Sequence, residues 1–321
     1  MKNTLLILLL SILNSCNGQD KGAEGIVYFS RDKGMTWKNT SDGLPEKISI
    51  GLGGIAASTS MLGLATKEDG IFIFDFKANK WLSIPTDEQI IKSNPGGLIF
   101  FKNEIFVGTQ FGGIFSSTNQ GKNWTSKNSG LGNLTVRKFA EIDNTLYAGT
   151  NDGLYSYNEV LKKWKFEYGQ SSLQVNGIAE LDGTIYIATN KGIYTPAGNS
   201  KNWKQVFPGH SLHNISSSEN TIYAMAYNEL FSSADRGKSW QSIQSGLPKG
   251  LYTFNVTKNH TTVFAGQWDG VYRKDGPGEA WKYSGNGLPG GFAATNLKTY
   301  HGILIISCSE RKLKQGMPAK E

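Results

Sequence analysis

The stretch SRDKGMTW at residues 30–37 returns in a softened form as SADRGKSW at residues 233–240, and a third copy, STNQGKNW, occupies residues 117–124. Each copy ends on a tryptophan. Seven of the eight tryptophans follow one another at intervals of 44, 43, 40, 39, 37 and 41 residues: Trp37, Trp81, Trp124, Trp164, Trp203, Trp240 and Trp281. Spacing this regular indicates that the chain repeats one structural unit of about 41 residues.

Each unit contains the same order of strand-like segments. An apolar segment such as LYAGT (146–150) is followed by a short turn, often with Asp-Gly or Gly-Gly, and then by a segment such as GLYSY (153–157). Such dipeptides between apolar runs indicate β-hairpins, because glycine supplies the positive φ of a tight turn. The tryptophan opens a further strand, and a segment such as VRKFAEID (136–143) begins the next unit. Four strands in about 41 residues is the unit of a β-propeller blade.

The two ends of the chain each supply half of a unit. The sequence begins with the last two strands of a blade, around GIVYFS (25–30), and ends with the first two, around FAATNLKTY (292–300) and GILIIS (302–307). Joining them in one sheet removes a free edge and closes a ring. The sequence therefore predicts an all-β fold over residues 25–310: a seven-bladed β-propeller of four-stranded blades, closed by N- and C-terminal strands that share one blade.

The repeated acidic residue is expected to hold a turn rather than to catalyse. In the hairpin between the third and fourth strands of a blade, Asp32 and Asp235 can accept backbone N–H bonds, and Asn119 would take the same part in the third copy. The glycine adopts a positive φ, and the tryptophan packs between sheets. These residues resemble the Asp-box, or bacterial neuraminidase repeat, written loosely as Ser-x-Asp-x-Gly-x-Thr-Trp. The resemblance covers residues 25–310 as a repeat pattern.

Proteins that share this repeat include sialidases, xyloglucan-active glycosidases, sortilin-type receptors and photosystem II stability and assembly factors. The recurring GLP at 43–45, 246–248 and 287–289 is also similar to the propeller repeats of periplasmic two-component sensors. The resemblance implies a fold, and it leaves the function open because unrelated functions share such folds. A third possible function, an extracytoplasmic sensor domain, is less favoured because this sequence shows no signalling segment.

A glycosidase is the alternative function. Resemblance to sialidases implies three arginines around a substrate carboxylate, but two of the five arginines lie in Asp-box turns and Arg311 lies in the tail, which leaves Arg137 and Arg273. Other glycosidases need two facing carboxylates. The acidic candidates flank hairpin turns, where Asp-Gly is also expected for geometry alone: Glu68, Asp69, Asp152, Glu229 and Asp269.

A binding site is expected at the mouth of the ring, where hairpin turns and the starts of the innermost strands converge. Trp268 could stack on a sugar or anchor a partner protein, or it could lie flat on its own blade. Glycine and asparagine there could bind a polar ligand, or could serve only tight packing around the axis. Aligning the units selects these candidates: Trp268, Arg137, Lys138, Asn176, His213, Asn255 and Phe111.

The sequence gives little indication of a metal or cofactor site. His210 and His213 are the closest pair of histidines, and the sequence places no third ligand beside them. No phosphate-binding loop or nucleotide fingerprint stands out, so neither a metal nor a cofactor is expected. Cys308 ends an apolar strand and is expected to be an inert buried thiol.

The N-terminus resembles a bacterial lipoprotein signal. MKNTLLILLLSILNSC combines a positive start, a short apolar run and a lipobox-like LNSC, which predicts a signal peptide over residues 1–15 and lipidation of Cys16. An ordinary cleaved signal is the alternative. Residues 16–24 form a small polar tether, and residues 311–321 a basic tail.

These features together predict an exported propeller, lipid-anchored in the envelope of a Gram-negative bacterium, with the outer membrane as the expected location. We expect a non-catalytic binding or assembly scaffold whose partner is an envelope protein or a polysaccharide. The formal net charge of +7 is diffuse, and no basic cluster interleaved with aromatic residues indicates nucleic acid binding.

Overall fold

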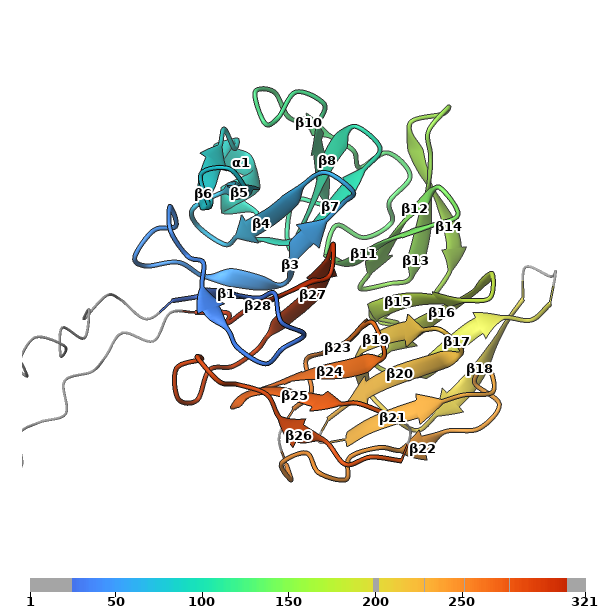
Figure 1. Cartoon of the computed structure of the whole chain (residues 1–321). Coiled ribbons are helices and arrows are strands. Elements are labelled where there is room, and N and C mark those ends of the chain that lie inside the picture. Colours follow the sequence, from blue (N-terminus) through green and yellow to red (C-terminus); the bar gives the residue numbers. More distant parts are fainter. Residues whose placement is uncertain (1–24, 199–201, 228, 251, 277, 311–321) are drawn as a thin grey trace, which may run out of the picture. The chain divides into compact units, whose positions relative to one another are not determined.

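The structure, a computed structural model, describes residues 25–198, 202–227, 229–250, 252–276 and 278–310. These residues form seven antiparallel sheets of four strands each, which confirms the predicted seven-bladed propeller (Figure 1). Cys16, the signal peptide, the tether and the basic tail lie outside the described residues. In the described part of the chain, no helix has the length and apolar character of a membrane span.

Blades 1 to 3 follow one another along the chain. Blade 1 contains β3 (Ile50–Ala57), β4 (Leu62–Thr66), β5 (Ile71–Asp75) and β6 (Lys80–Ile84). Blade 2 contains β7 (Pro95–Phe101), β8 (Glu104–Thr109), β9 (Ile114–Ser117) and β10 (Thr125–Ser126). Blade 3 contains β11 (Val136–Ile142), β12 (Thr145–Thr150), β13 (Leu154–Asn158) and β14 (Lys163–Tyr168).

Blades 4 to 6 repeat the same order. Blade 4 contains β15 (Val175–Leu181), β16 (Thr184–Thr189), β17 (Gly192–Pro196) and β18 (Trp203–Pro208). Blade 5 contains β19 (Leu212–Ser218), β20 (Thr221–Ala226), β21 (Glu229–Ser233) and β22 (Gln241–Ser242). Blade 6 contains β23 (Asn255–Asn259), β24 (Thr262–Gln267), β25 (Gly270–Lys274) and β26 (Lys282–Tyr283).

Blade 7 joins the two ends of the propeller. Its strand order is β2 (Lys38–Asn39), β1 (Val27–Ser30), β28 (Ile303–Ser307) and β27 (Asn296–Tyr300), so the N-terminal strands form the outer half and the C-terminal strands the inner half. The first strands of successive blades contact one another from β3 to β27, and β27 contacts β3. The ring is thereby closed around a central channel, and the joint between the chain ends is an ordinary antiparallel pair.

The repeated tryptophans fasten each blade to the preceding one. The indole N–H of Trp81, which is 1 % exposed, donates to the carbonyl of Thr40 just beyond the outer strand of blade 7, at 2.7 Å. Five other indoles bond in the same way to the preceding blade: Trp37, Trp124, Trp164, Trp240 and Trp281. Trp203 instead stacks on Tyr168 with ring centroids 4.9 Å apart. Aromatic packing and a buried hydrogen bond thus recur at the interfaces between blades.

The Asp-box residues lie in the hairpins between third and fourth strands. Asp235 accepts bonds from the hydroxyl of Ser233 (2.8 Å), the backbone N–H of Ser239 (2.9 Å) and the hydroxyl of Ser239 (2.6 Å). Asp32 accepts the equivalent bonds from Ser30 and Thr36. Asn119 keeps two of these contacts through its Oδ1.

One short helix interrupts the strand pattern. Helix α1 (Glu88–Lys92) connects blade 1 to blade 2, and Ile90 on it is fully buried among apolar side chains of both blades. The sequence does not indicate this helix, because five residues show too little periodicity to identify one.

Candidate functional site

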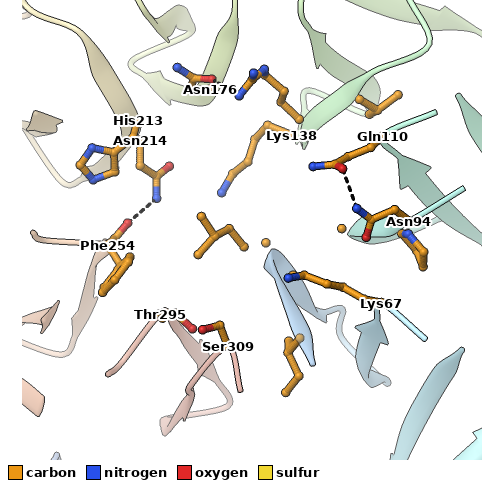
Figure 2. A pocket seen from close by; sticks show the side chains of 18 of the residues that line it. Lys67, Asn94, Gln110, Lys138, Asn176, His213, Asn214, Phe254, Thr295 and Ser309 are labelled. Carbon is orange, nitrogen blue, oxygen red and sulfur yellow. Dashed lines mark hydrogen bonds between the residues drawn. The ribbon is translucent and has the colours of Figure 1, made fainter. Parts of the chain in front are cut away.

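A cavity of about 420 Å³ opens at one end of the central channel, and every blade contributes to its wall (Figure 2). We call this end the mouth. It is the end that carries the turns between second and third strands, because Lys67 and Gln110 from those turns line the cavity beside the starts of the innermost strands. In blades 1 to 4 a buried threonine at the end of the second strand stabilises this turn by donating a hydrogen bond to the carbonyl of a glycine in the turn. In blade 3, Thr150 Oγ1 donates to Gly153 O at 3.0 Å.

Bulges in the innermost strands place three of the predicted site residues. In β11 the pairing passes from Val136 opposite Thr150 to Lys138 opposite Gly149, so Arg137 is an extra residue. Asn176 in β15 and His213 in β19 are extra residues in the same way. A bulge redirects a side chain that regular pairing would send elsewhere. All three residues line the mouth cavity.

Arg137 is held by amide oxygens and not by a carboxylate. Its Nε donates to Asn151 Oδ1, and its Nη1 donates to Asn176 Oδ1 at 3.0 Å. Burial lowers the pKa of Arg137, and a guanidinium stays charged even so. The side chain is therefore a fixed positive charge in the cavity wall.

His213 is neutral at pH 7. Its Nε2–H donates to Thr253 O at 2.7 Å, and its ring stacks on Tyr252 with centroids 3.7 Å apart. Burial, opposed by the bond to Thr253 and assisted by the charge of Lys138, lowers the pKa of His213 to about 4. Its Nδ1 is a buried acceptor without a hydrogen-bond partner among the described residues.

The asparagines at the mouth join neighbouring innermost strands. Asn176 Nδ2 donates to Leu212 O (2.7 Å), and Asn255 Nδ2 donates to Thr295 O (2.6 Å). Asn214 and Asn296 make the equivalent bonds to Phe254 O and Gly51 O. We call these four side chains the asparagine belt. Because the oxygens of Asn176 and Asn255 also accept bonds, from Arg137 and Asn214, both side chains are engaged within the protein.

The two aromatic candidates do not line the cavity. Trp268 is 50 % exposed on its turn and packs edge-on against Phe254, which does line the cavity, with centroids 4.9 Å apart. Phe254 contacts Tyr252, and Tyr252 contacts Tyr227. We call Tyr227, Tyr252, Phe254 and Trp268 the aromatic flank of the mouth. Phe111 is 71 % exposed on the turn of blade 2 and has no ring contact with this flank.

The charge of the mouth has one sign. Its lining includes Lys67, Arg137 and Lys138, and no Asp or Glu occurs among the described residues that line it. Figure 2 shows the amine ends of Lys67 and Lys138 pointing toward the middle of the ring. None of the ion pairs in the described part of the chain involves these three cations. The mouth is thus an uncompensated positive site.

Several lining residues escaped the sequence analysis. Lys67 and Gln110 directly follow the buried threonine of their turns, and Asn94 donates to Gln110 Oε1 at 2.5 Å. Tyr227 and Tyr252 complete the aromatic flank. Their positions in the aligned repeat units could have identified these residues, because they lie just after the second strands or just before the innermost strands.

The acidic candidates and His210 lie outside the mouth cavity, whereas His213 lines it. Asp152 braces the loop before β15 by accepting from Asn133 Nδ2 (2.9 Å) and Ser172 N (3.1 Å), and Asp269 accepts from the hydroxyl of Tyr272 (2.9 Å). His210 stacks on Phe207, outside the cavity. Within the ranges that the structure describes, no three His, Cys, Asp or Glu side chains are grouped to hold a metal ion.

No family model matches the sequence, and no curated protein matches it. Among solved structures, the chain is similar to one described as the extracellular domain of a one component system, BT4673, from B. thetaiotaomicron (14 % identity, TM-score 0.70, 85 % of this chain). It is also similar to YCF48 bound to D1 peptide (12 %, 0.64, covering 82 % of this chain and 96 % of that one). YCF48 from Cyanidioschyzon merolae is a further match (14 %, 0.61, 89 % and 96 %).

The chain corresponds to 39 % of the BT4673 chain, so that protein has a larger extracellular part than this propeller matches. At these identities the likeness concerns the fold. The chain shares its seven-bladed β-propeller architecture with an extracellular domain and with a protein that has been solved in a peptide complex.

Proposed function

We propose that this protein is a non-catalytic binding or assembly scaffold of the cell envelope, and that its protein or glycan ligand carries a negatively charged group into the mouth cavity. The observation that supports this most directly is the set of three cations, Lys67, Arg137 and Lys138, without a carboxylate among the described residues of the lining. Uncompensated charge in a concave site attracts ligands of opposite sign and strengthens their hydrogen bonds.

The mouth has the dimensions and chemistry of a ligand site. Its volume of about 420 Å³ lies within the usual range for small-molecule and side-chain pockets. Arg137 is held in place by Asn151 and Asn176, so little entropy is lost when it binds. The aromatic flank offers exposed rings at one side, where a sugar ring or an apolar side chain can pack.

The structural neighbours are consistent with a binding role. YCF48 has been solved with a peptide bound, and the BT4673 structure is described as the extracellular domain of a one component system. A propeller of this architecture can therefore present a peptide-binding surface. Glycosidase chemistry is not favoured, because the acidic candidates lie outside the cavity and some of them brace loops.

We further propose that Cys16 carries the lipid that anchors the scaffold, with residues 16–24 as the tether. The supporting observation is the lipobox-like LNSC that ends the apolar run. Mass spectrometry of the mature N-terminus should find a diacylglyceryl-modified cysteine, and Cys16→Ser should leave the protein unlipidated. An unmodified mature N-terminus would end this part of the proposal.

The binding proposal is tested by cross-linking the native protein in its own membranes and identifying captured partners by mass spectrometry. The variant Arg137→Gln should lose the specific partner, since replacing a charged hydrogen-bond donor lowers affinity at least about tenfold. The matched control is Arg236→Gln, which removes an arginine that pairs with Asp182 outside the cavity. Equal capture by wild type and Arg137→Gln would contradict a ligand at the mouth.

A second variant separates the two parts of the site. Trp268→Ala should weaken the interaction without abolishing it, because Trp268 lies beside the cavity and not in its wall. A panel of acidic and neutral oligosaccharides, titrated against the purified protein, covers the glycan form of the proposal. If neutral sugars bind as tightly as acidic ones, the proposal that the mouth selects a negatively charged ligand is contradicted.

A further inference from the structure

The central channel has a second opening opposite the mouth. A cavity of about 1010 Å³ lies there, beside the hairpins that join first and second strands, such as Ser58–Ser60 and Asp143–Asn144. Lys138 lines both this far cavity and the mouth cavity. It therefore stands where the two cavities meet, at a point that we call the waist of the channel. Lys298 of β27 lines the far cavity.

The two lysines approach the axis from opposite sides of the ring. Strand β11 carries Lys138 and is separated from β27 by two innermost strands in one direction and three in the other. Lys138 pairs with Gly149, one residue before the end of β12, and Lys298 pairs with Ile305, two residues before the end of β28. The two residues therefore lie at nearly the same level of the channel wall, where Lys138 lines both cavities and Lys298 lines the far cavity. Figure 2 shows the amine of Lys138 near the middle of the ring.

Neither lysine has a negative partner. No ion pair in the described part of the chain includes Lys138 or Lys298, whereas Lys102, which lines the same far cavity, is paired with Glu159 at 2.6 Å. The other charged or titratable groups on the mouth side are Lys67, Arg137, His213 and Tyr252. Those around the far cavity are Lys102, Glu141, Asp143 and Glu180.

None of the far-side carboxylates in the described part of the chain forms an ion pair with Lys138 or Lys298. Glu141 is exposed, Asp143 lies in the hairpin at the outer end, and Glu180 accepts a bond from Gly183 N in its own hairpin. The hydroxyl of Ser216, which also lines the far cavity, is buried without a hydrogen-bond partner among the described residues. Two cations and an unsatisfied hydroxyl thus line the channel without an ion-paired carboxylate, and Lys298 is exposed to it.

Confinement of two like charges has an electrostatic cost. Burial, and then the charge of Lys298, lowers the pKa of Lys138 to about 7. The charge of Lys138 therefore titrates near neutral pH. An anion between the two amines would favour the charged form of both, so its binding should be coupled to proton uptake.

We propose that Lys138 and Lys298 together bind one compact oxyanion at the waist of the channel, such as a carboxylate, sulfate or phosphate group. This site shares Lys138 with the mouth but needs neither Lys67 nor Arg137, so it stands even if Arg137→Gln shows that the mouth binds no partner. The oxyanion could be a free inorganic ion or the acidic group of a longer ligand that extends through the channel. The chemistry of recognition, two ammonium groups on one set of oxygens, is the same in both cases.

The test is isothermal titration of the full chain with sodium sulfate at constant ionic strength, because sulfate does not titrate near neutral pH. Affinity should fall roughly thirtyfold between pH 6 and pH 8.5, as the charged fraction of Lys138 falls. Titrations at pH 7 in buffers of different ionisation enthalpy should show net proton uptake. Parallel titrations with a sulfated oligosaccharide distinguish the sources: tighter binding than free sulfate indicates the acidic group of a longer ligand, and equal or weaker binding indicates a free inorganic anion.

Variants isolate the two lysines. Lys138→Gln and Lys298→Gln should each weaken sulfate binding at least tenfold, while Lys102→Gln should change it less than about twofold, because Lys102 is already paired with Glu159. Lys138→Arg should retain binding and lose most of the pH dependence, since a guanidinium does not deprotonate in this range. Sulfate binding that survives both glutamine variants and does not depend on pH would be an adventitious ion only and would overturn the proposal.

Discussion

Single polar side chains set the hairpins of the repeat, and blade 2 offers a natural comparison. Asp235 and Asp32 each accept three hydrogen bonds from hydroxyl and backbone groups, and Asn119 accepts two at the same position with a neutral amide. The carboxylate is therefore not required to form the turn. It adds charge-assisted bonds that an amide oxygen supplies more weakly.

The acid stability of the protein should depend on this difference. Hydrogen bonds from the Ser239 hydroxyl, the Ser239 N–H and the Ser233 hydroxyl lower the pKa of Asp235 to about 2, below its ordinary value of 3.8. The stabilisation is present above pH 3.8 and is lost as pH falls through 2. Asp235→Asn should thus reduce the loss of stability between pH 4 and pH 2, measured by denaturation at each pH. The converse change, Asn119→Asp, should increase that loss, and equal pH profiles for all three proteins would contradict this account.

At the level of the blade, the tryptophan that follows the Asp-box position has two roles, packing and hydrogen bonding, which substitution can separate. Trp81→Phe keeps an aromatic ring but leaves the carbonyl of Thr40 without the indole donor, in a buried interface. We expect a loss of about 1–3 kcal/mol in the free energy of unfolding, measured by urea denaturation. Trp203 makes no indole hydrogen bond among the described residues and stacks on Tyr168. Trp203→Phe should therefore cost less than about 1 kcal/mol, and similar losses for both would show that packing alone matters.

The strands were predictable from sequence wherever local chemistry determines them. The segment 62–66 was expected as a strand and is β4, because an apolar run followed by a glycine turn has one plausible local structure. The bulges at Arg137, Asn176 and His213 were not predicted, since a bulge is defined by the register of a partner strand. Alignment of the units still selected these positions, because equivalent residues of a repeat occupy equivalent places around the axis.

The composition of the site was harder to predict than its place. Lys298 and Lys138 belong to blades that are far apart in the sequence, and only closure of the ring brings their amines to the same channel. Likewise Tyr252, which precedes β23 of blade 6, stacks on His213 of blade 5. Contacts of this kind depend on the number and tilt of the blades, which no single repeat encodes.

For the whole molecule, the joint in blade 7 is the place where the ring can open without breaking the chain. Separation of β1 from β28 releases the contact between β27 and β3, whereas opening between any other two blades also strains a covalent connection. The asparagine belt crosses this joint once. Asn296 Nδ2 donates to Gly51 O at 3.1 Å, and Asn296 Oδ1 accepts from Gly53 N at 2.8 Å.

Asn296→Ala should consequently loosen the closure of the ring more than its local contacts suggest. The substitution removes two bonds between β27 and β3 and leaves Gly51 O and Gly53 N without these partners, at a cost of about 2–3 kcal/mol. Hydrogen exchange of the β1 and β28 amides should become roughly thirtyfold to a hundredfold faster, because these strands separate when the ring opens. Asn255→Ala removes a belt bond between blades that the chain also connects, so it should leave exchange in β1 and β28 within about threefold of the wild type. If both variants accelerate exchange equally in all seven blades, opening is global and the joint in blade 7 has no special place in it.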